Sequence, residues 1–141
     1  MKSILVPVDG SAPSLNAVKT AIKLQRDYGA GTMYVINVQP PIISGNVTRF
    51  ISHDAINEFY QEEGEKMLAP AKSLLSEAGT SFEASVQVGP IAKVIAEFAK
   101  NHQCDAIIMG TRGLGGVSGL VLGSITTKVL HLTETPVTLV K

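Results

Sequence analysis

Several features that would point to a particular class of protein are scarce in this sequence. Its 141 residues include one cysteine, Cys104, which has no second cysteine to pair with, so an intramolecular disulfide is excluded. Twelve lysine and arginine residues stand against 12 aspartate and glutamate residues, so the chain lacks the basic excess that binds phosphodiester backbones or anionic membranes. We therefore expect no nucleic-acid partner and no membrane partner.

Long apolar runs are also missing. The run at 106–109 (AIIM) is among the longest, and it is far shorter than the roughly 20 residues that span a bilayer. The first residues, MKSILVPVDGS, lack the apolar core of roughly seven or more residues that defines a signal peptide. We therefore expect a cytoplasmic protein.

Tryptophan is absent and aromatic residues make up only 5% of the chain, yet the composition is that of an ordinary globular protein. Hydrophobic residues account for 45% and charged residues for 17%, which excludes a disordered chain. A chain of this length can bury roughly two thirds of the surface it exposes when unfolded. Because no linker or low-complexity tract divides it, we expect residues 1–141 to form one domain.

Short apolar runs alternate along the chain with segments of helical periodicity. We predict strands at 4–8, 32–38, 82–88, 105–109 and 136–140. We predict helices between them, near 12–28, 54–78, 91–101 and 124–133. Residues 42–53 show no clear period and are expected to form a mobile connection. Apolar strands that alternate with helices are typical of a parallel sheet covered on both faces, so the predicted fold class is α/β.

Local signals mark the ends of the first two helices. Ser11 is suited to cap the first helix and Gly29 to stop it, and we expect Tyr28 on its apolar face. In the second helix, Pro70 should kink or split the chain of hydrogen bonds. The side chains that we expect this second helix to bury are Ile56, Phe59, Met67, Ala71, Leu74 and Leu75.

Two segments follow predicted strands at the edge of the sheet where open parallel sheets bind ligands. One is Asp9-Gly10-Ser11, and the other is the stretch 110–124, which contains six glycines in its first fourteen residues and opens a helix. Glycine leaves room for close approach to phosphate, and the free N–H groups at a helix N-terminus attract anions. The stretch 110–124 therefore favours a phosphate-binding loop, and the alternative is a surface loop that binds nothing.

Two common phosphate-binding patterns do not fit this stretch. A Walker loop would end in Gly-Lys-Ser or Gly-Lys-Thr, whereas Lys128 lies four residues beyond Ser124. A dinucleotide fingerprint would follow the first strand, where the sequence instead has Asp9-Gly10-Ser11-Ala12.

The spacing of Gly110, Gly113, Gly123 and Ser124 resembles the motif of ATP-binding members of the universal stress protein family: Gly, two residues, Gly, nine residues, Gly, then Ser or Thr. The resemblance extends over essentially the whole chain. Three further segments are similar to the first, fourth and last strands of that family: ILVPVDGS (4–11), DAIIMG (105–110) and PVTLV (136–140).

The resemblance implies a Rossmann-like fold of the adenine nucleotide alpha hydrolase type. Its parallel sheet would be open, with five strands in the order 3-2-1-4-5 and helices on both faces. The protein would form a homodimer through the fifth strand.

The implied cofactor is ATP or AMP, with Mg²⁺ accompanying the nucleotide. Pro7, Val8 and Asp9 would meet the adenosine, and the backbone of Val38 would meet adenine. The remaining implied site residues, around the base, ribose and phosphates, are Met109, Gly110, Arg112, Gly113, Gly123, Ser124 and Ile125.

Two of these residues also have simpler interpretations. Asp9 could end its strand by accepting a hydrogen bond from the N–H of Ser11 or Ala12. Beside a nucleotide, the same carboxylate would accept a ribose hydroxyl or help to hold Mg²⁺. Arg112 is either a solvated loop residue or a phosphate partner.

Catalytic and metal-binding candidates are weak elsewhere in the chain. No two of His53, His102 and His131 have the three- or four-residue spacing of a metal site on one helix face. Cys104 precedes an apolar strand and is expected to behave as a small buried hydrophobe. We therefore expect no catalytic residue and no metal site formed by the protein alone.

The favoured function is a dimeric, nucleotide-binding regulator used in the stress response, as the family resemblance implies. A slow ATPase or self-phosphorylating enzyme is the alternative, with Ser118, Ser124 and Thr126 as candidate acceptors but no dedicated base. A flavodoxin-like electron carrier would share the fold class. It is disfavoured because the stretch 110–124 contains no aromatic residue to stack on a flavin.

Overall fold

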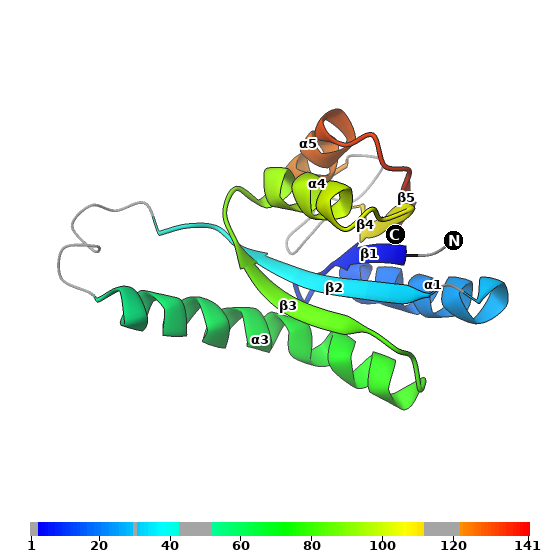
Figure 1. The fold of residues 1–141 in the computed structure, drawn as a ribbon, viewed down its shortest axis with the longest axis horizontal. Coiled ribbons are helices and arrows are strands. Elements are labelled where there is room, and N and C mark those ends of the chain that lie inside the picture. The colour runs from blue at the N-terminus through cyan, green and yellow to red at the C-terminus, as the bar shows by residue number, and fades with distance from the viewer. Residues whose placement is uncertain (1–2, 30, 43–51, 112–121) are drawn as a thin grey trace.

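The computed structural model describes residues 3–29, 31–42, 52–111 and 122–141 (Figure 1). The predicted mobile connection at 42–53 lies mostly outside the described residues. In chain order the elements are β1 (Ser3–Pro7), α1 (Ala12–Tyr28), β2 (Thr32–Gln39), α3 (His53–Glu77), β3 (Glu83–Val88), α4 (Ile91–Asn101), β4 (Ala106–Gly110), α5 (Ser124–Leu132) and β5 (Val137–Val140).

The five strands form one parallel sheet in the order β3-β2-β1-β4-β5, which confirms the predicted fold class and strand order. Because β2 lies on one side of β1 and β4 on the other, the chain changes direction across the sheet at β1. The carboxyl ends of β1 and β4 therefore border the crevice where ligands bind in sheets of this kind.

Helices cover both faces of the sheet (Figure 1). On one face α1 and α3 pack over Ile4 and Val6, and on the other face α4 and α5 pack over Leu5 and Ile107. Successive residues of a strand point to opposite faces, so a central strand with a core on each side has to be apolar throughout. This requirement explains why β1 is completely buried.

The ends of α1 lie where the sequence predicts them. The hydroxyl of Ser11 accepts a hydrogen bond from the Ser14 N–H at 3.4 Å, and Gly29 ends the helix in the left-handed conformation with φ 63°. The prediction that Tyr28 belongs to the buried face is wrong, because its side chain is 70% exposed. The core on this face includes α1 residues only as far as Leu24, so the last turn of the helix extends past it.

The long helix α3 corrects two predictions. Of the two effects expected of Pro70, a kink or a split, the split is excluded, because α3 is one continuous helix. Pro70 is exposed, so the carbonyl group that loses its helical partner faces the solvent side. Phe59 was expected in the core but is 48% exposed, and its neighbour Tyr60 is buried instead. The buried stripe consists of Tyr60, Gly64, Leu68, Ala71 and Leu75.

Of the helices in the described part of the chain, none combines the length and apolar character needed to cross a membrane.

Candidate functional site

A cavity of about 290 Å³ lies at the carboxyl ends of β1, β2 and β4, between the first turns of α1, α4 and α5. All the predicted site residues within the described part of the chain line it: Pro7, Val8, Asp9, Val38, Met109, Gly110, Gly123, Ser124 and Ile125. The other two predicted residues, Arg112 and Gly113, lie outside the described residues. The structure thus gathers predicted residues from four separate segments of the sequence around one space.

The walls of this cavity differ in polarity. Apolar side chains form one part of the lining, contributed by Val38, Ile91, Ile95, Met109 and Ile125. Hydroxyl and carboxylate groups contribute to the rest, from Asp9, Ser11, Ser14, Ser124 and Thr126. A cavity with apolar walls and a few convergent polar groups is suited to a ligand that has both a flat apolar part and a polar part.

Asp9 is held in a turn at the end of β1. Its Oδ1 accepts a hydrogen bond from the Ser11 N–H at 2.9 Å, which confirms the strand-ending interpretation. Its own N–H donates to the hydroxyl of Ser14 at 3.4 Å. The side chain is nevertheless exposed, and among the described residues no hydrogen bond engages its Oδ2. Asp9 lines the cavity, and among the described residues its Oδ2 is left for a further partner.

The ends of β1 and β2 are joined beside the cavity by a buried amide. Asn37 is 4% exposed, and its Nδ2 donates to the carbonyl oxygen of Val8 at 2.8 Å. Its Oδ1 accepts from the Nε2 of Gln39 at 2.7 Å. Because a buried amide that loses its partners is costly, this network holds the backbone of Val8 in place against β2.

Gly110 has a packing role that the sequence did not reveal. A Cβ at this position would lie 2.8 Å from the Cβ of Pro13 and 3.1 Å from the backbone nitrogen of Ser14. The absence of a side chain therefore lets the first turn of α1 pack directly on the end of β4. This contact brings Ser11 and Ser14 to the same cavity as Gly123 and Ser124.

The start of α5 is fixed by hydrogen bonds to β4 and β5. The Gly123 N–H donates to the Thr111 carbonyl at 2.8 Å, and the Thr111 N–H donates to the Val140 carbonyl at 2.9 Å. The hydroxyl of Thr126, which is buried, donates to the Gly110 carbonyl at 3.2 Å. Within the described residues, no side chain caps the helix at Gly123. The N–H groups of its first turn are thus available to an acceptor in the cavity.

A model of the universal stress protein family matches residues 1–141. The chain belongs to the universal stress protein family. Universal stress protein MJ0531 of Methanocaldococcus jannaschii is 34% identical over 142 residues, which cover 99% of this chain and 82% of that protein.

Solved structures agree with this assignment. The structure of hypothetical protein MJ0577 has a TM-score of 0.84 and 26% identity, covering 99% of this chain and 95% of that chain. A universal stress protein solved in complex with cAMP has a TM-score of 0.73 and 25% identity, covering 99% of this chain and 97% of that chain.

Some lining residues of this universal stress protein were missed by the sequence analysis. Ile91 and Ile95 belong to the helix predicted at 91–101, which the sequence analysis did not connect with the site. Ser14 and Asn37 line the cavity as well, and so does Thr126, which the sequence analysis named only as a candidate acceptor for self-phosphorylation. Their burial, 4%, 4% and 2% exposed respectively, is unusual for polar side chains, but burial is a property of the folded chain and not of the sequence.

The described residues of this universal stress protein give little support for a metal site or a cysteine nucleophile. Within the described ranges, no group of three or more His, Cys, Asp or Glu side chains could hold a metal ion. Cys104 is buried, as predicted. Burial raises the pKa of the Cys104 thiol, a hydrogen bond with Ser3 opposes this rise, and the charge of Asp105 adds to it. The thiol form is favoured, which argues against a role as a nucleophile.

Proposed function

We propose that this universal stress protein binds an adenine nucleotide, ATP or AMP, in the cavity at the carboxyl ends of β1, β2 and β4. One observation carries the proposal. The nine described residues that the family motif and strands imply all line a single cavity, with an apolar wall and the uncapped start of a helix. The related protein that was solved with cAMP supports the same chemical class of ligand.

The apolar part of the lining would hold the base. Val38 and Met109, 7% and 6% exposed, are set in the ends of β2 and β4, and Ile91 and Ile95 bring the first turns of α4 against them. A purine ring is flat and apolar on its faces, so it is stabilised between such side chains. The backbone of Val38 would supply hydrogen bonds to the edge of adenine.

The polar part of the lining would hold the ribose and phosphates. The free Oδ2 of Asp9 would accept a ribose hydroxyl or, with phosphate oxygens, help to hold Mg²⁺. The N–H groups at the start of α5 and the hydroxyl of Ser124 would donate to phosphate. Arg112 and Gly113, in the glycine-rich segment, would complete this part of the site.

A binding role is favoured over hydrolysis. Among the described residues that line the cavity, Asp9 is the one acidic or basic side chain, and it already accepts a hydrogen bond from Ser11. Efficient phosphoryl transfer needs a positioned nucleophile together with a base or metal that serves it. We therefore propose a cytoplasmic regulator, in which nucleotide binding changes the surface presented to partners.

We also propose that the protein acts as a homodimer through β5. This edge strand, Val137–Val140, carries no charged side chain, and Leu130 and Leu132 of the adjacent helix α5 are 41% and 56% exposed. An uncharged edge strand readily pairs with a second copy of itself, and a two-fold partner closes both edges at once.

The nucleotide proposal is tested by thermal unfolding of protein from which bound ligand has been stripped. Ligand at about 100 times its Kd adds roughly 2.7 kcal/mol of stability. For a domain of this size, this stabilisation raises the Tm by roughly 5 to 10 °C. We expect such a shift with ATP or AMP in the presence of Mg²⁺. Absence of any shift with millimolar ATP, ADP and AMP would show that the proposal is wrong.

A further inference from the structure

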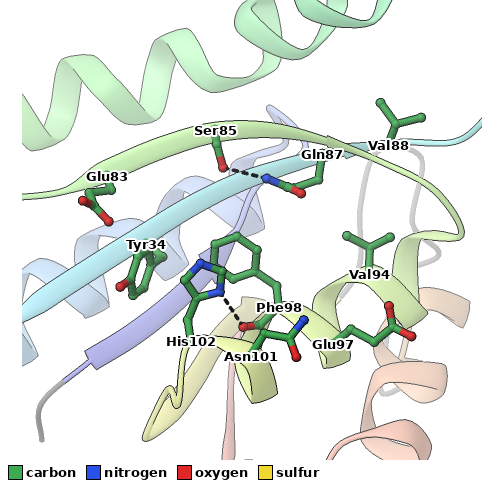
Figure 2. Close-up of a pocket in the computed structure, with 10 residues that line it drawn as sticks. All are labelled: Tyr34, Glu83, Ser85, Gln87, Val88, Val94, Glu97, Phe98, Asn101 and His102. Atoms are coloured by element: carbon green, nitrogen blue, oxygen red, sulfur yellow. Dashed lines mark hydrogen bonds between the residues drawn. The ribbon is translucent and has the colours of Figure 1, made fainter.

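A second hollow, of about 470 Å³, lies between β3 and α4 and shares no lining residue with the nucleotide cavity. We call it the β3/α4 groove (Figure 2). Its lining comes from one residue of β2, four of β3, four of α4 and the residue that follows α4: Tyr34, Glu83, Ser85, Gln87, Val88, Val94, Glu97, Phe98, Asn101 and His102.

Among the described elements, α3 covers one face of β3 more fully than α4 covers the other, and the groove lies on the side of α4. On the side of α3, Ala84 and Val86 join the hydrophobic core. On the side of α4, Ser85 and Gln87 line the groove, and the Nε2 of Gln87 donates to the Ser85 hydroxyl at 3.0 Å (Figure 2). β3 is also an edge strand, and within the described part of the chain it pairs only with β2. Its outer backbone groups are thus available to another strand.

An aromatic cluster forms part of the groove. The rings of Phe98 and His102 are stacked, with their centroids 3.8 Å apart and an angle of 12° between their planes. Tyr34 meets the Phe98 ring edge-on, with a centroid separation of 5.5 Å. The Nδ1 of His102 lies 3.0 Å from the Phe98 carbonyl oxygen, which helps to fix the imidazole (Figure 2). The cluster is thus a preformed surface for an apolar side chain.

The groove has an acidic character. Glu83 and Glu97 line it from opposite sides, and none of the described residues that line it is a lysine or arginine. Glu97 has an ion-pair partner in Lys93 at 3.9 Å, but both side chains are more than half exposed, so the pair contributes little. Glu83 has no ion-pair partner among the described residues. A cationic occupant would therefore be attracted to both carboxylates.

We propose that the β3/α4 groove docks an extended basic segment of a partner protein, which adds to the sheet as a strand beside β3. Backbone hydrogen bonds to β3 would give affinity, and alternate side chains would give specificity. Two lysine or arginine side chains would meet Glu83 and Glu97, and an apolar side chain between them would pack on Phe98.

The charges of the groove favour a basic segment over a second copy of this chain as the occupant. A second copy of β3, with the sequence EASVQV, carries no lysine or arginine and would therefore bring no cationic side chain to Glu83 and Glu97. The other edge strand, β5, carries no charge. The two edges of the sheet are therefore suited to different partners, a second copy at β5 and a basic segment at β3.

The proposal is tested with a defined probe, a fluorescein-labelled peptide of sequence Thr-Lys-Thr-Leu-Thr-Lys-Thr, titrated into the full chain. Its lysine and leucine side chains share one face of a strand. We expect saturable binding at submillimolar concentration, with NMR shift changes concentrated in residues 83–88 and 97–102. The same peptide with glutamate in place of lysine should bind at least about tenfold more weakly.

Matched charge reversals complete the test. Glu83→Lys with Glu97→Lys should weaken binding of the lysine peptide at least about tenfold. Glu58→Lys with Glu62→Lys, the same change of charge on exposed positions of α3, should change it less than about twofold. Equal binding of the two peptides, an equal effect of the two double variants, or no shift changes at β3 and α4 with millimolar peptide would each overturn the proposal.

Discussion

Gly110 and Pro13 are in direct contact across the interface between β4 and α1, and a Cβ on Gly110 would lie 2.8 Å from that of Pro13. One glycine of the glycine-rich motif thus has a structural role that does not depend on a ligand. The contact places the start of α1, with Ser11 and Ser14, at the cavity.

Gly110→Ala is therefore expected to destabilise the protein even without nucleotide. Overpacking of this kind costs about 1 to 3 kcal/mol, which lowers the Tm by roughly 3 to 10 °C. Nucleotide affinity should fall as well, because α1 has to move away from β4. Thermal unfolding and calorimetric titration measure the two effects, and an unchanged Tm in the absence of ligand would contradict the packing role.

Gly64 and Val86 allow a double-mutant test of how α3 packs on β3. A Cβ on Gly64 would overlap the methyl groups of Val86. Alanine gains about 1 kcal/mol over glycine in a helix, but the overlap costs about 1 to 3 kcal/mol, so Gly64→Ala should destabilise the protein. In a Val86→Ala background the overlap with the methyl groups is removed, although the Cβ of residue 86 stays 3.0 Å from the added Cβ, so the same substitution should destabilise the protein less. Urea unfolding of the four proteins measures the coupling, and strictly additive effects would rule out the contact.

Replacements in the glycine-rich motif should reduce nucleotide affinity by different amounts, and Gly123→Val should reduce it more than Arg112→Ala. Gly123 has φ −62°, so valine is tolerated by its backbone, and the expected loss of nucleotide affinity in Gly123→Val comes from blocking the approach of phosphate. Arg112→Ala should reduce affinity less, because a partly solvated ion pair contributes only about 1 kcal/mol. Calorimetry with ATP and AMP measures both. If folded Gly123→Val binds nucleotide as the wild type does, the motif does not contact the ligand.

The dimer proposal predicts that the mass of the intact protein at micromolar concentration, measured by light scattering, is twice that of one chain. Thr138 is exposed on β5, and lysine there should produce monomers, because like charges would meet across the two-fold axis. Deletion of 138–141 should yield monomers or insoluble protein. A monomeric mass for the wild type would exclude the dimer.

Cys104 should make stability depend on pH in the alkaline range. Burial raises the pKa of its thiol, so the folded protein keeps a proton that the unfolded chain releases. The resulting stabilisation is present below the pKa of the unfolded chain, about 9, and is lost as pH rises through the higher pKa of the folded state. Between pH 8 and 10.5, the unfolding free energy of the wild type should therefore fall more steeply than that of Cys104→Ala. If the unfolding free energies of the two proteins change with pH in parallel, the Cys104 thiol does not contribute to the pH dependence of stability.

Much of the architecture was predictable because the sequence pattern and the fold reflect the same physical requirement. β1 and β4 are nearly all apolar because a central parallel strand has a core on both faces, and their runs could be recognised without a structure. The caps Ser11 and Gly29 depend on neighbouring residues alone, so they too were predictable. The strand order and the set of site residues came from the resemblance to the universal stress protein family, since periodicity does not specify which strands are neighbours.

Only the tertiary structure decided which part of the sheet each apolar helix face packs against. Periodicity indicated an apolar face on α3 but placed Phe59 in the core where Tyr60 is buried, because the direction of that face depends on how α3 lies against β3. Ile91 and Ile95 were recognisable as apolar, but only the packing of α4 over the end of β2 makes them walls of a cavity. The sequence determines which side chains leave water, and the packing of elements distant in the chain determines whether the space beside them is filled, as in the core, or left open for a ligand.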